Sequence, residues 1–219
     1  MDVLILLPTY NEEENIGTII DLIRAVSNKW RILIVDGGSR DNTVKIAKMK
    51  GAEVLTVSVR GKGKAVAAAF EQINEENIVL LDADLSYSPS EIPKFLEKLE
   101  KCDVVVGSRF AGTIEEEAMI LIKRLGNLFL TSLGNLLYKG NATDICSGFW
   151  AFRKTAYKKM NITAPNFELE ANFFTECMKK KLKLCEIPTI YKKRGGKSKI
   201  SIPDGFKIAL FLFSERFLN

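Results

Sequence analysis

Histidine is absent from this chain of 219 residues. Without it the protein has no Ser-His-Asp or Cys-His nucleophile, and no imidazole is present as a metal ligand or general base. Any chemistry must therefore use carboxylates, basic side chains or a bound metal.

Cysteine is scarce, and none of the four residues belongs to a CxxC pair. Cys102, Cys146, Cys177 and Cys185 each lie in a mostly apolar stretch. We therefore expect buried free thiols in a reducing compartment, rather than a disulfide or a zinc site.

Long hydrophobic runs are also missing. Near the C-terminus the longest uncharged apolar run is residues 208–213, whereas a membrane-spanning helix needs about 20 residues. The chain enters the strand-like run Val3–Leu7 without a basic segment before it. We expect neither a transmembrane helix nor a signal peptide.

The net charge of +5 is unevenly distributed. Residues 1–178 carry 21 basic and 24 acidic side chains, whereas residues 179–199 carry nine basic and one acidic. A basic block of this kind indicates an anionic partner, such as a phosphate, a nucleic acid or a membrane surface. A merely solvated basic face is the alternative.

The composition, 47% hydrophobic and 27% charged, fits one globular α/β domain. Short β-branched runs alternate with segments of helical periodicity, a pattern that predicts a doubly wound, mostly parallel sheet flanked by helices. We expect strands at 3–7, 32–35, 53–57, 78–81, 104–106, 147–152 and 184–187, and helices at 11–27, 41–50, 63–73, 89–101 and 167–180.

Two further segments are apolar and helical in pattern. Residues 115–138 contain Gly126 and Gly134 and predict one broken helix or two helices on a surface. The Phe-rich end, residues 202–218, predicts an amphipathic helix that packs on the domain or lies in a membrane interface.

Acidic residues follow several of the expected strands. In an open α/β sheet, ligands bind beyond the carboxyl ends of the strands. Asp36, Asp82, Asp84 and Arg109 all follow strands in this way. Asp82 and Asp84 are hard oxygen ligands suited to Mg²⁺ or Mn²⁺, with room left for water and a substrate diphosphate. Such a metal would neutralise a leaving diphosphate.

A basic, glycine-containing stretch, Arg-Gly-Lys-Gly-Lys, occupies residues 60–64. It resembles a phosphate-binding loop in composition but matches neither the P-loop nor the dinucleotide pattern. The stretch either contacts a phosphate or is a solvated basic turn, and both interpretations remain open.

Six motifs together resemble a known family. They occur in the order found in family-two glycosyltransferases, and they resemble most closely the dolichyl-phosphate mannose synthases, which are polyprenyl-phosphate glycosyltransferases. The resemblance covers essentially the whole chain. The motifs are Pro8–Glu12, Val35–Thr43, Asp82–Leu85, Gly107–Phe110, Ser147–Phe149 and Lys197–Lys199.

The resemblance implies a GT-A catalytic domain over residues 1–200, followed by the amphipathic helix 201–219. It implies transfer of a sugar, with inversion, from a nucleotide sugar (GDP-mannose or a UDP-sugar) to dolichyl or polyprenyl phosphate. The product would be a dolichyl-phosphate sugar for glycan assembly, and Mg²⁺ or Mn²⁺ would be the cofactor.

The resemblance also assigns roles to residues. Asp84, Arg109 and Arg194 would be catalytic, with Asp84 the direct metal ligand and both arginines on phosphates. Arg124 would lie beside the acceptor phosphate. The donor would be contacted by Pro8, Tyr10, Glu12, Ile34, Asp36, Asp82, Ala83, Asp84, Arg109, Arg194 and Lys199.

The sequence departs from the family pattern at two positions. Gly37 stands where a second Asp is usual, and Ser86 stands where a Gln or Glu often follows the metal-binding Asp. Ser86 would complete the metal set with Asp82 and Asp84, but a serine is a poorer ligand. Metal affinity or the donor sugar is then expected to differ from the mannose enzymes.

A lipid phosphate is ionised at neutral pH, so it can attack the anomeric carbon without a general base. Its oily chain requires a membrane surface. We expect a peripheral protein on the cytoplasmic face, with a membrane-anchoring subunit as a further partner. Headgroup contacts are expected from Lys192, Lys193, Arg194, Lys197 and Lys199, and apolar contacts from residues 120–137 and 206–217.

Two alternatives remain open. The same fold transferring to a sugar or glycolipid hydroxyl would need a carboxylate base, and Glu168 or Glu170 is the candidate. A non-catalytic nucleotide-binding or nucleic-acid-binding domain is the second. We expect no nucleic acid as partner, because Tyr191 is the one aromatic in the basic block and the acidic rim would repel it.

Overall fold

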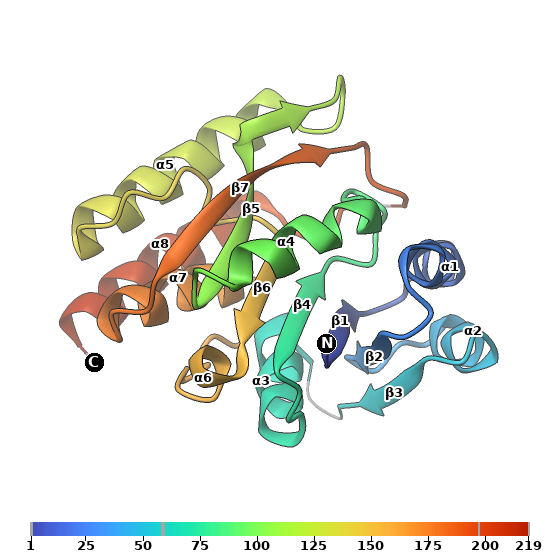
Figure 1. Cartoon of the computed structure of the whole chain (residues 1–219). Helices are drawn as coiled ribbons and strands as arrows, with labels where there is room; N and C mark the ends of the chain where they lie inside the picture. The colour runs from blue at the N-terminus through green and yellow to red at the C-terminus, as the bar shows by residue number, and fades with distance from the viewer. Residues whose placement is uncertain (1, 58–59, 197, 219) are drawn as a thin grey trace.

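The computed structural model describes residues 2–57, 60–196 and 198–218. Within them, seven strands form one sheet in the order β3-β2-β1-β4-β6-β5-β7, with helices on both faces (Figure 1). β6 runs antiparallel to β4 and β5, and the other neighbours are parallel. The predicted mostly parallel, helix-flanked sheet is confirmed.

The elements follow the predicted alternation. The strands are β1 (Val3–Thr9), β2 (Arg31–Asp36), β3 (Glu53–Thr56), β4 (Asn77–Leu81), β5 (Val104–Ile114), β6 (Phe149–Arg153) and β7 (Leu184–Tyr191). The helices are α1 (Ile16–Val26), α2 (Thr43–Met49), α3 (Lys62–Gln72), α4 (Ile92–Leu99), α5 (Leu121–Tyr138), α6 (Lys154–Tyr157), α7 (Leu169–Lys179) and α8 (Ile202–Phe217), with a 3-10 turn at Pro89–Glu91.

Side chains of the central strands alternate between two hydrophobic cores. In β1, Leu4 and Leu6 join the core under α3, α5, α7 and α8, whereas Ile5 and Leu7 join the core under α1, α2 and α4. The period of two in a strand sends successive side chains to opposite faces, so a strand covered on both sides is apolar throughout.

Residues 104–138 differ from the prediction. β5 continues to Ile114 and pairs with β7, with a register shift between Ser108 and Thr113. α5 then runs unbroken from Leu121 to Tyr138, so the prediction of one broken helix or two helices is wrong. A Cβ at Gly134 would lie 2.9 Å from the Ile145 side chain, so this glycine permits close packing rather than a kink.

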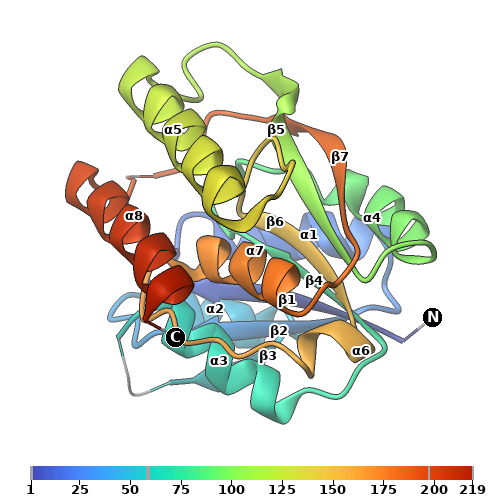
Figure 2. The same cartoon turned by 90° about the vertical axis from the view of Figure 1, so that its left-hand side faces the viewer.

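α8 packs beside α5 and α7, and α5 and α8 lie next to each other at one side of the molecule (Figure 2). A capping box between Ser201 and Asp204 starts the helix. Ile208 and Leu212 are buried in the core, which anchors α8 to the domain. In the described residues, no helix is long and apolar enough to span a bilayer.

Two of the cysteines form a disulfide, so the prediction of four free thiols is wrong for them. Cys102 and Cys185 are bonded, with Cα atoms 6.2 Å apart, whereas Cys146 and Cys177 are free. The pairing of Val104 in β5 with Leu184 in β7 brings the two cysteines together. Because 83 residues separate them, only the tertiary pairing of the strands reveals this proximity.

The disulfide is expected to stabilise the fold by closing a long loop in the unfolded chain, by about 4 kcal/mol for a loop of this size. Reduction should lower the urea midpoint. Titration of thiols in denaturant should find Cys146 and Cys177 before reduction and all four cysteines after it. Cys102→Ser should remove the sensitivity to reductant, whereas Cys146→Ser should keep it. An unfolding midpoint that reductant leaves unchanged in the parent protein would contradict this assignment.

Candidate functional site

A cleft of about 920 Å³ lies beyond the carboxyl ends of β1, β2 and β4. Its walls include the loop before α3, the basic segment (residues 191–196 and 198–201), and the facing sides of α5 and α8. Nine of the predicted site residues line it: Pro8, Tyr10, Glu12, Asp82, Ala83, Asp84, Arg109, Arg194 and Lys199.

The other predicted site residues lie outside this lining. Ile34, Asp36 and Ser86 are buried in the walls, at most 1% exposed. Arg124 lies on the exposed side of α5, whereas its neighbour Lys123 lines the cleft. Of the predicted headgroup contacts, Lys197 lies outside the described residues.

Asp82 is held at the end of β4 by two close neighbours. The Lys62 ammonium lies 2.6 Å from Asp82 Oδ1 and also 2.6 Å from Glu170 Oε1. On the other side, a Cβ on Gly148 would come within 2.0 Å of Asp82 Oδ2. The Asp82 carboxylate therefore has little freedom to move.

Asp84 is oriented by the turn that follows it. Leu85 adopts a left-handed φ of 66°, which lets the Ser86 hydroxyl and backbone N–H donate to Asp84 Oδ1 at 2.5 and 3.0 Å. Strained backbone of this kind clusters at functional sites. Burial, and then the nearby Asp82 charge, raise the pKa of the Asp84 carboxyl.

The basic segment is bonded to this turn through its backbone. Lys192 N–H donates to the Ser86 carbonyl, and Gly195 N–H donates to the Asp84 carbonyl at 2.7 Å. Arg194 Nη2 thereby lies 3.2 Å from Asp84 Oδ2. Its Nε is buried, and none of the described residues is its hydrogen-bond partner. An unsatisfied buried donor in a cleft wall is available to an anionic ligand.

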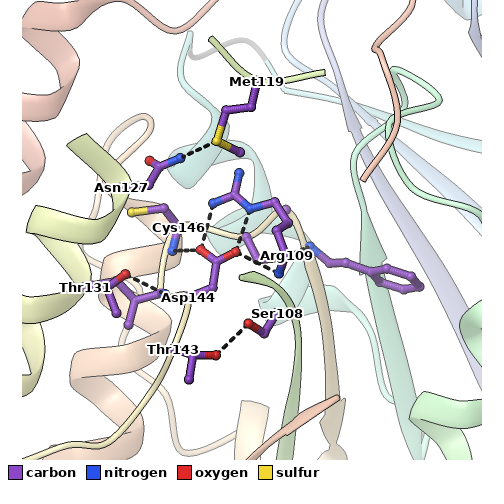
Figure 3. Close-up of polar contacts among 12 residues, drawn as sticks. Ser108, Arg109, Met119, Asn127, Thr131, Thr143, Asp144 and Cys146 are labelled. Atoms are coloured by element: carbon purple, nitrogen blue, oxygen red, sulfur yellow. Dashed lines mark hydrogen bonds and ion pairs between the residues drawn. The ribbon is translucent and has the colours of Figure 1, made fainter. Parts of the chain in front are cut away.

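Arg109 forms a bidentate ion pair with Asp144 (Figure 3). Its Nε and Nη2 lie 2.6 and 2.7 Å from the two Asp144 oxygens, and its backbone N–H also donates to Asp144. Burial alone would lower the pKa of Arg109, but the adjacent Asp144 charge raises it well above its ordinary value. The guanidinium is therefore charged and fixed in orientation.

The β1 end of the cleft is closed by cationic side chains around Tyr10. Arg60 Nη2 donates to the Tyr10 hydroxyl at 2.6 Å. Lys199 Nζ donates to the backbone carbonyls of Tyr10 and Asn11 and pairs with the Glu12 carboxylate. Three predicted donor contacts, Tyr10, Glu12 and Lys199, therefore form one connected group.

The wall formed by α5 and α8 is apolar and open. Gly126 and Gly205 both line it, and a Cβ on either glycine would meet nothing within 4 Å. Lys123 also lines the cleft, with its Nζ 2.6 Å from Ser198 Oγ. Burial, and then the Arg194 charge, lower the pKa of Lys123. A polar rim is thus continuous with an apolar groove.

Sequence reasoning missed the roles of three residues. Lys62 lies in the basic stretch 60–64, which the sequence indicated as a possible phosphate-binding loop without assigning a role to Lys62 itself. Lys123 and Asp144 carry no motif signal before the fold is known. Asp144 lies three residues before the Ser147–Phe149 motif, and the position of a charged residue beside a motif is the one clue the sequence offers.

The two carboxylates considered as bases are placed differently. Glu170 lines the cleft and is paired with Lys62. Burial raises the pKa of Glu170, and Lys62 opposes that rise. Glu168 is buried, accepts a bond from the Asn166 backbone N–H at 3.0 Å, and is not among the lining residues.

Sequence comparison matches residues 4–160 to the glycosyl transferase family 2 model. Glycosyltransferase AglJ of Haloferax volcanii is 35% identical over 99% of this chain and 73% of its own length. A dolichyl-phosphate hexose transferase of the same organism is 31% identical over 91% of this chain and 86% of its own. A UDP-N-acetylglucosamine–dolichyl-phosphate N-acetylglucosaminyltransferase of Methanococcus voltae is 30% identical, over 93% and 92%.

Solved structures show the same fold. Glucosyl-3-phosphoglycerate synthase of Mycobacterium tuberculosis, with Mn²⁺, UDP-glucose and phosphoglyceric acid bound, superposes with a TM-score of 0.76 at 18% identity. The alignment covers 99% of this chain and 79% of that one. This likeness supports the GT-A architecture, and the family match covers most of the sheet and its rim. The chain belongs to glycosyltransferase family 2 and is a glycosyltransferase.

Proposed function

We propose that this protein transfers a sugar from a UDP-sugar to dolichyl or another polyprenyl phosphate, with residues 1–200 as the catalytic domain and 201–219 as a membrane-facing helix. One observation carries the proposal. A single cleft joins an acid-and-arginine rim to an apolar groove between α5 and α8, which matches an acceptor with a phosphate head and an oily tail. The named activities of two relatives support it.

The rim fits a divalent metal shared with the donor. The described residues contain no group of three or more acidic or cysteine side chains that would hold a metal ion by themselves. Asp82 and Asp84 would hold Mg²⁺ or Mn²⁺ together with diphosphate and water oxygens. Ser86 supports Asp84 by its hydrogen bond. When bound, the metal would supply positive charge to the departing diphosphate.

The arginines would align two anionic substrates. Among the described residues, neither the buried Nε of Arg194 nor Nη1 of Arg109 has a hydrogen-bond partner. Both residues line the cleft. Positioning the acceptor phosphate against the anomeric carbon would place the reacting groups in line and offset their repulsion.

The pairing of Glu170 supports a phosphate acceptor over a hydroxyl acceptor. A hydroxyl must lose its proton in the reaction, so it needs a free base within reach. Glu170 is paired with Lys62, and Glu168 faces a backbone N–H. A phosphate acceptor is already ionised, so it needs neither glutamate as a base.

Asp36 supports uracil as the donor base. Its Oδ2 accepts hydrogen bonds from the Gly38 and Ser39 N–H groups, both at 3.0 Å, whereas its buried Oδ1 has no partner among the described residues. Its neighbours Val35 and Gly37 line the cleft. One free acceptor suits the single imide N–H of uracil, whereas guanine presents two adjacent donors.

The exposed sides of α5 and α8 support docking on a membrane. On α8, apolar residues with helical spacing are 44–70% exposed, opposite the buried Ile208 and Leu212. Burial of such side chains in an interface is favourable by about 1.5–3 kcal/mol each. The cytoplasmic face and a membrane-anchoring subunit stay predictions. The α8 residues are Phe206, Leu210, Phe213 and Phe217.

The activity assay tests donor and acceptor together. The purified protein, a divalent metal and a prenyl phosphate are mixed with UDP-sugars and GDP-sugars in turn, and nucleoside diphosphate release and lipid-linked sugar are measured. We expect release that depends on prenyl phosphate, with the best UDP-sugar turned over at least about tenfold faster than any GDP-sugar. Faster turnover of GDP-mannose would overturn the uracil assignment, and no lipid product with any donor would overturn the acceptor.

Gly148→Ala tests the metal and diphosphate site. The added methyl would displace the Asp82 carboxylate, and a misplacement of about 1 Å costs on the order of 100-fold in rate. We expect calorimetry to show weaker Mn²⁺-dependent UDP binding, and the assay to show that loss of turnover. Gly126→Ala, whose Cβ meets nothing within 4 Å, is the matched control for UDP binding. Equal UDP affinity in the two variants would argue against Asp82 as a donor contact.

Vesicle binding tests the apolar face of α8. Leu210→Ser with Phe217→Ser should lower binding to anionic vesicles at least about tenfold, because two large apolar contacts are lost, while leaving the melting temperature close to that of the parent. The control is Leu22→Ser with Met49→Ser, two exposed residues on α1 and α2. Sedimentation with vesicles measures both. A parent protein that does not sediment at low salt would rule out this docking face.

A further inference from the structure

The Lys62 side chain bridges two carboxylates that approach the cleft from different elements. Asp82 follows β4, and Glu170 lies in the first turn of α7. Both oxygens are 2.6 Å from Lys62 Nζ, and the lysine side chain is 16% exposed. The lysine thus forms a close ion pair with each carboxylate.

The backbone fixes this bridge in place. Gly63 N–H and Lys64 N–H donate to the carbonyls of Asn166 and Pro165, at 3.2 and 3.3 Å. A Cβ on Gly61 would come within 2.1 Å of the Pro165 carbonyl oxygen, so the contact needs a glycine. The start of α3 is thus bonded to the segment that leads into α7, which carries Glu170.

Glu170 would be placed to act as a base if Lys62 did not pair with it. It lines the cleft, and its Oε1 is held by Lys62. A free carboxylate beside a bound nucleotide sugar would promote hydrolysis. In that step the water oxygen bonds to the anomeric carbon, the water proton passes to Glu170, and the bond from the anomeric carbon to the diphosphate oxygen breaks with its electron pair on UDP.

We propose that Lys62 is a specificity-determining residue, which pairs with Glu170 and so keeps the cleft from transferring the sugar to water. The inference rests on the proposed phosphate acceptor, since an acceptor that is already ionised loses nothing when the carboxylate is paired. The two arginines of the rim form ion pairs with other carboxylates, Arg194 with Asp84 and Arg109 with Asp144. Lys62 is placed to hold Glu170.

The experiment measures how the donor is partitioned. Lys62→Met and Lys62→Gln are compared with the parent and with Lys64→Met, an exposed lysine of the same helix outside the cleft lining. With saturating UDP-sugar and metal, free sugar is measured without acceptor, and lipid-linked sugar is measured with prenyl phosphate. We expect the ratio of hydrolysis to transfer to rise at least tenfold in the Lys62 variants and to stay within twofold in Lys64→Met.

A second substitution identifies the base. Lys62→Met combined with Glu170→Gln should return the ratio to within threefold of the parent value. A merely structural role of Lys62 would lower both reactions together and leave the ratio unchanged.

An unchanged ratio of hydrolysis to transfer in either Lys62 variant that still binds UDP would overturn the proposal. A raised ratio that Glu170→Gln does not reverse would also overturn it. So would loss of UDP binding in both Lys62 variants, because Lys62 would then be a donor-binding residue. The hydrolysis measurement contains no acceptor. Failure of the parent to transfer to prenyl phosphate therefore tests the proposed function separately.

Discussion

The structure depends on one electrostatic constraint: a cleft built from carboxylates must receive substrates that are themselves anionic. Acidic side chains at the rim are accordingly paired with cations from other segments of the chain. Unpaired, these groups would repel both a diphosphate and an acceptor phosphate. The pairs are Asp82 with Lys62, Asp84 with Arg194, Glu12 with Lys199 and, in the wall behind them, Asp144 with Arg109.

These pairs differ in burial and so in what they contribute. The Arg109–Asp144 pair is almost fully buried, and removing one partner of such a pair costs about 3–5 kcal/mol because the other charge is left uncompensated. Arg194 and Lys199 are 24% and 34% exposed, so their pairs are partly screened and can exchange the protein carboxylate for a ligand anion. The buried pair therefore sets geometry, while the exposed pairs leave room for binding.

Much of the fold follows from local pattern, because strands buried on both faces are apolar throughout and end at the rim. The positions of Pro8–Glu12 and Asp82–Asp84 were predictable for that reason. The disulfide, the length of β5 and the partners of Lys62 and Arg109 were not, since each depends on segments 20 to 108 residues apart. Arg124 shows the same limit: helical position decides whether it or Lys123 faces the cleft, and a shift of one residue turns a side chain by about 100°.

The absence of histidine gains a physical meaning from the pairing of Glu170. An imidazole near neutral pKa would be a ready base for water, and so would a carboxylate with both oxygens free. The chain has no imidazole, and one oxygen of the Glu170 carboxylate is held by Lys62. An acceptor that arrives already ionised is then favoured over one that must lose a proton. The selection of a phosphate acceptor can thus arise as much from withholding a base as from the arginines that attract the phosphate.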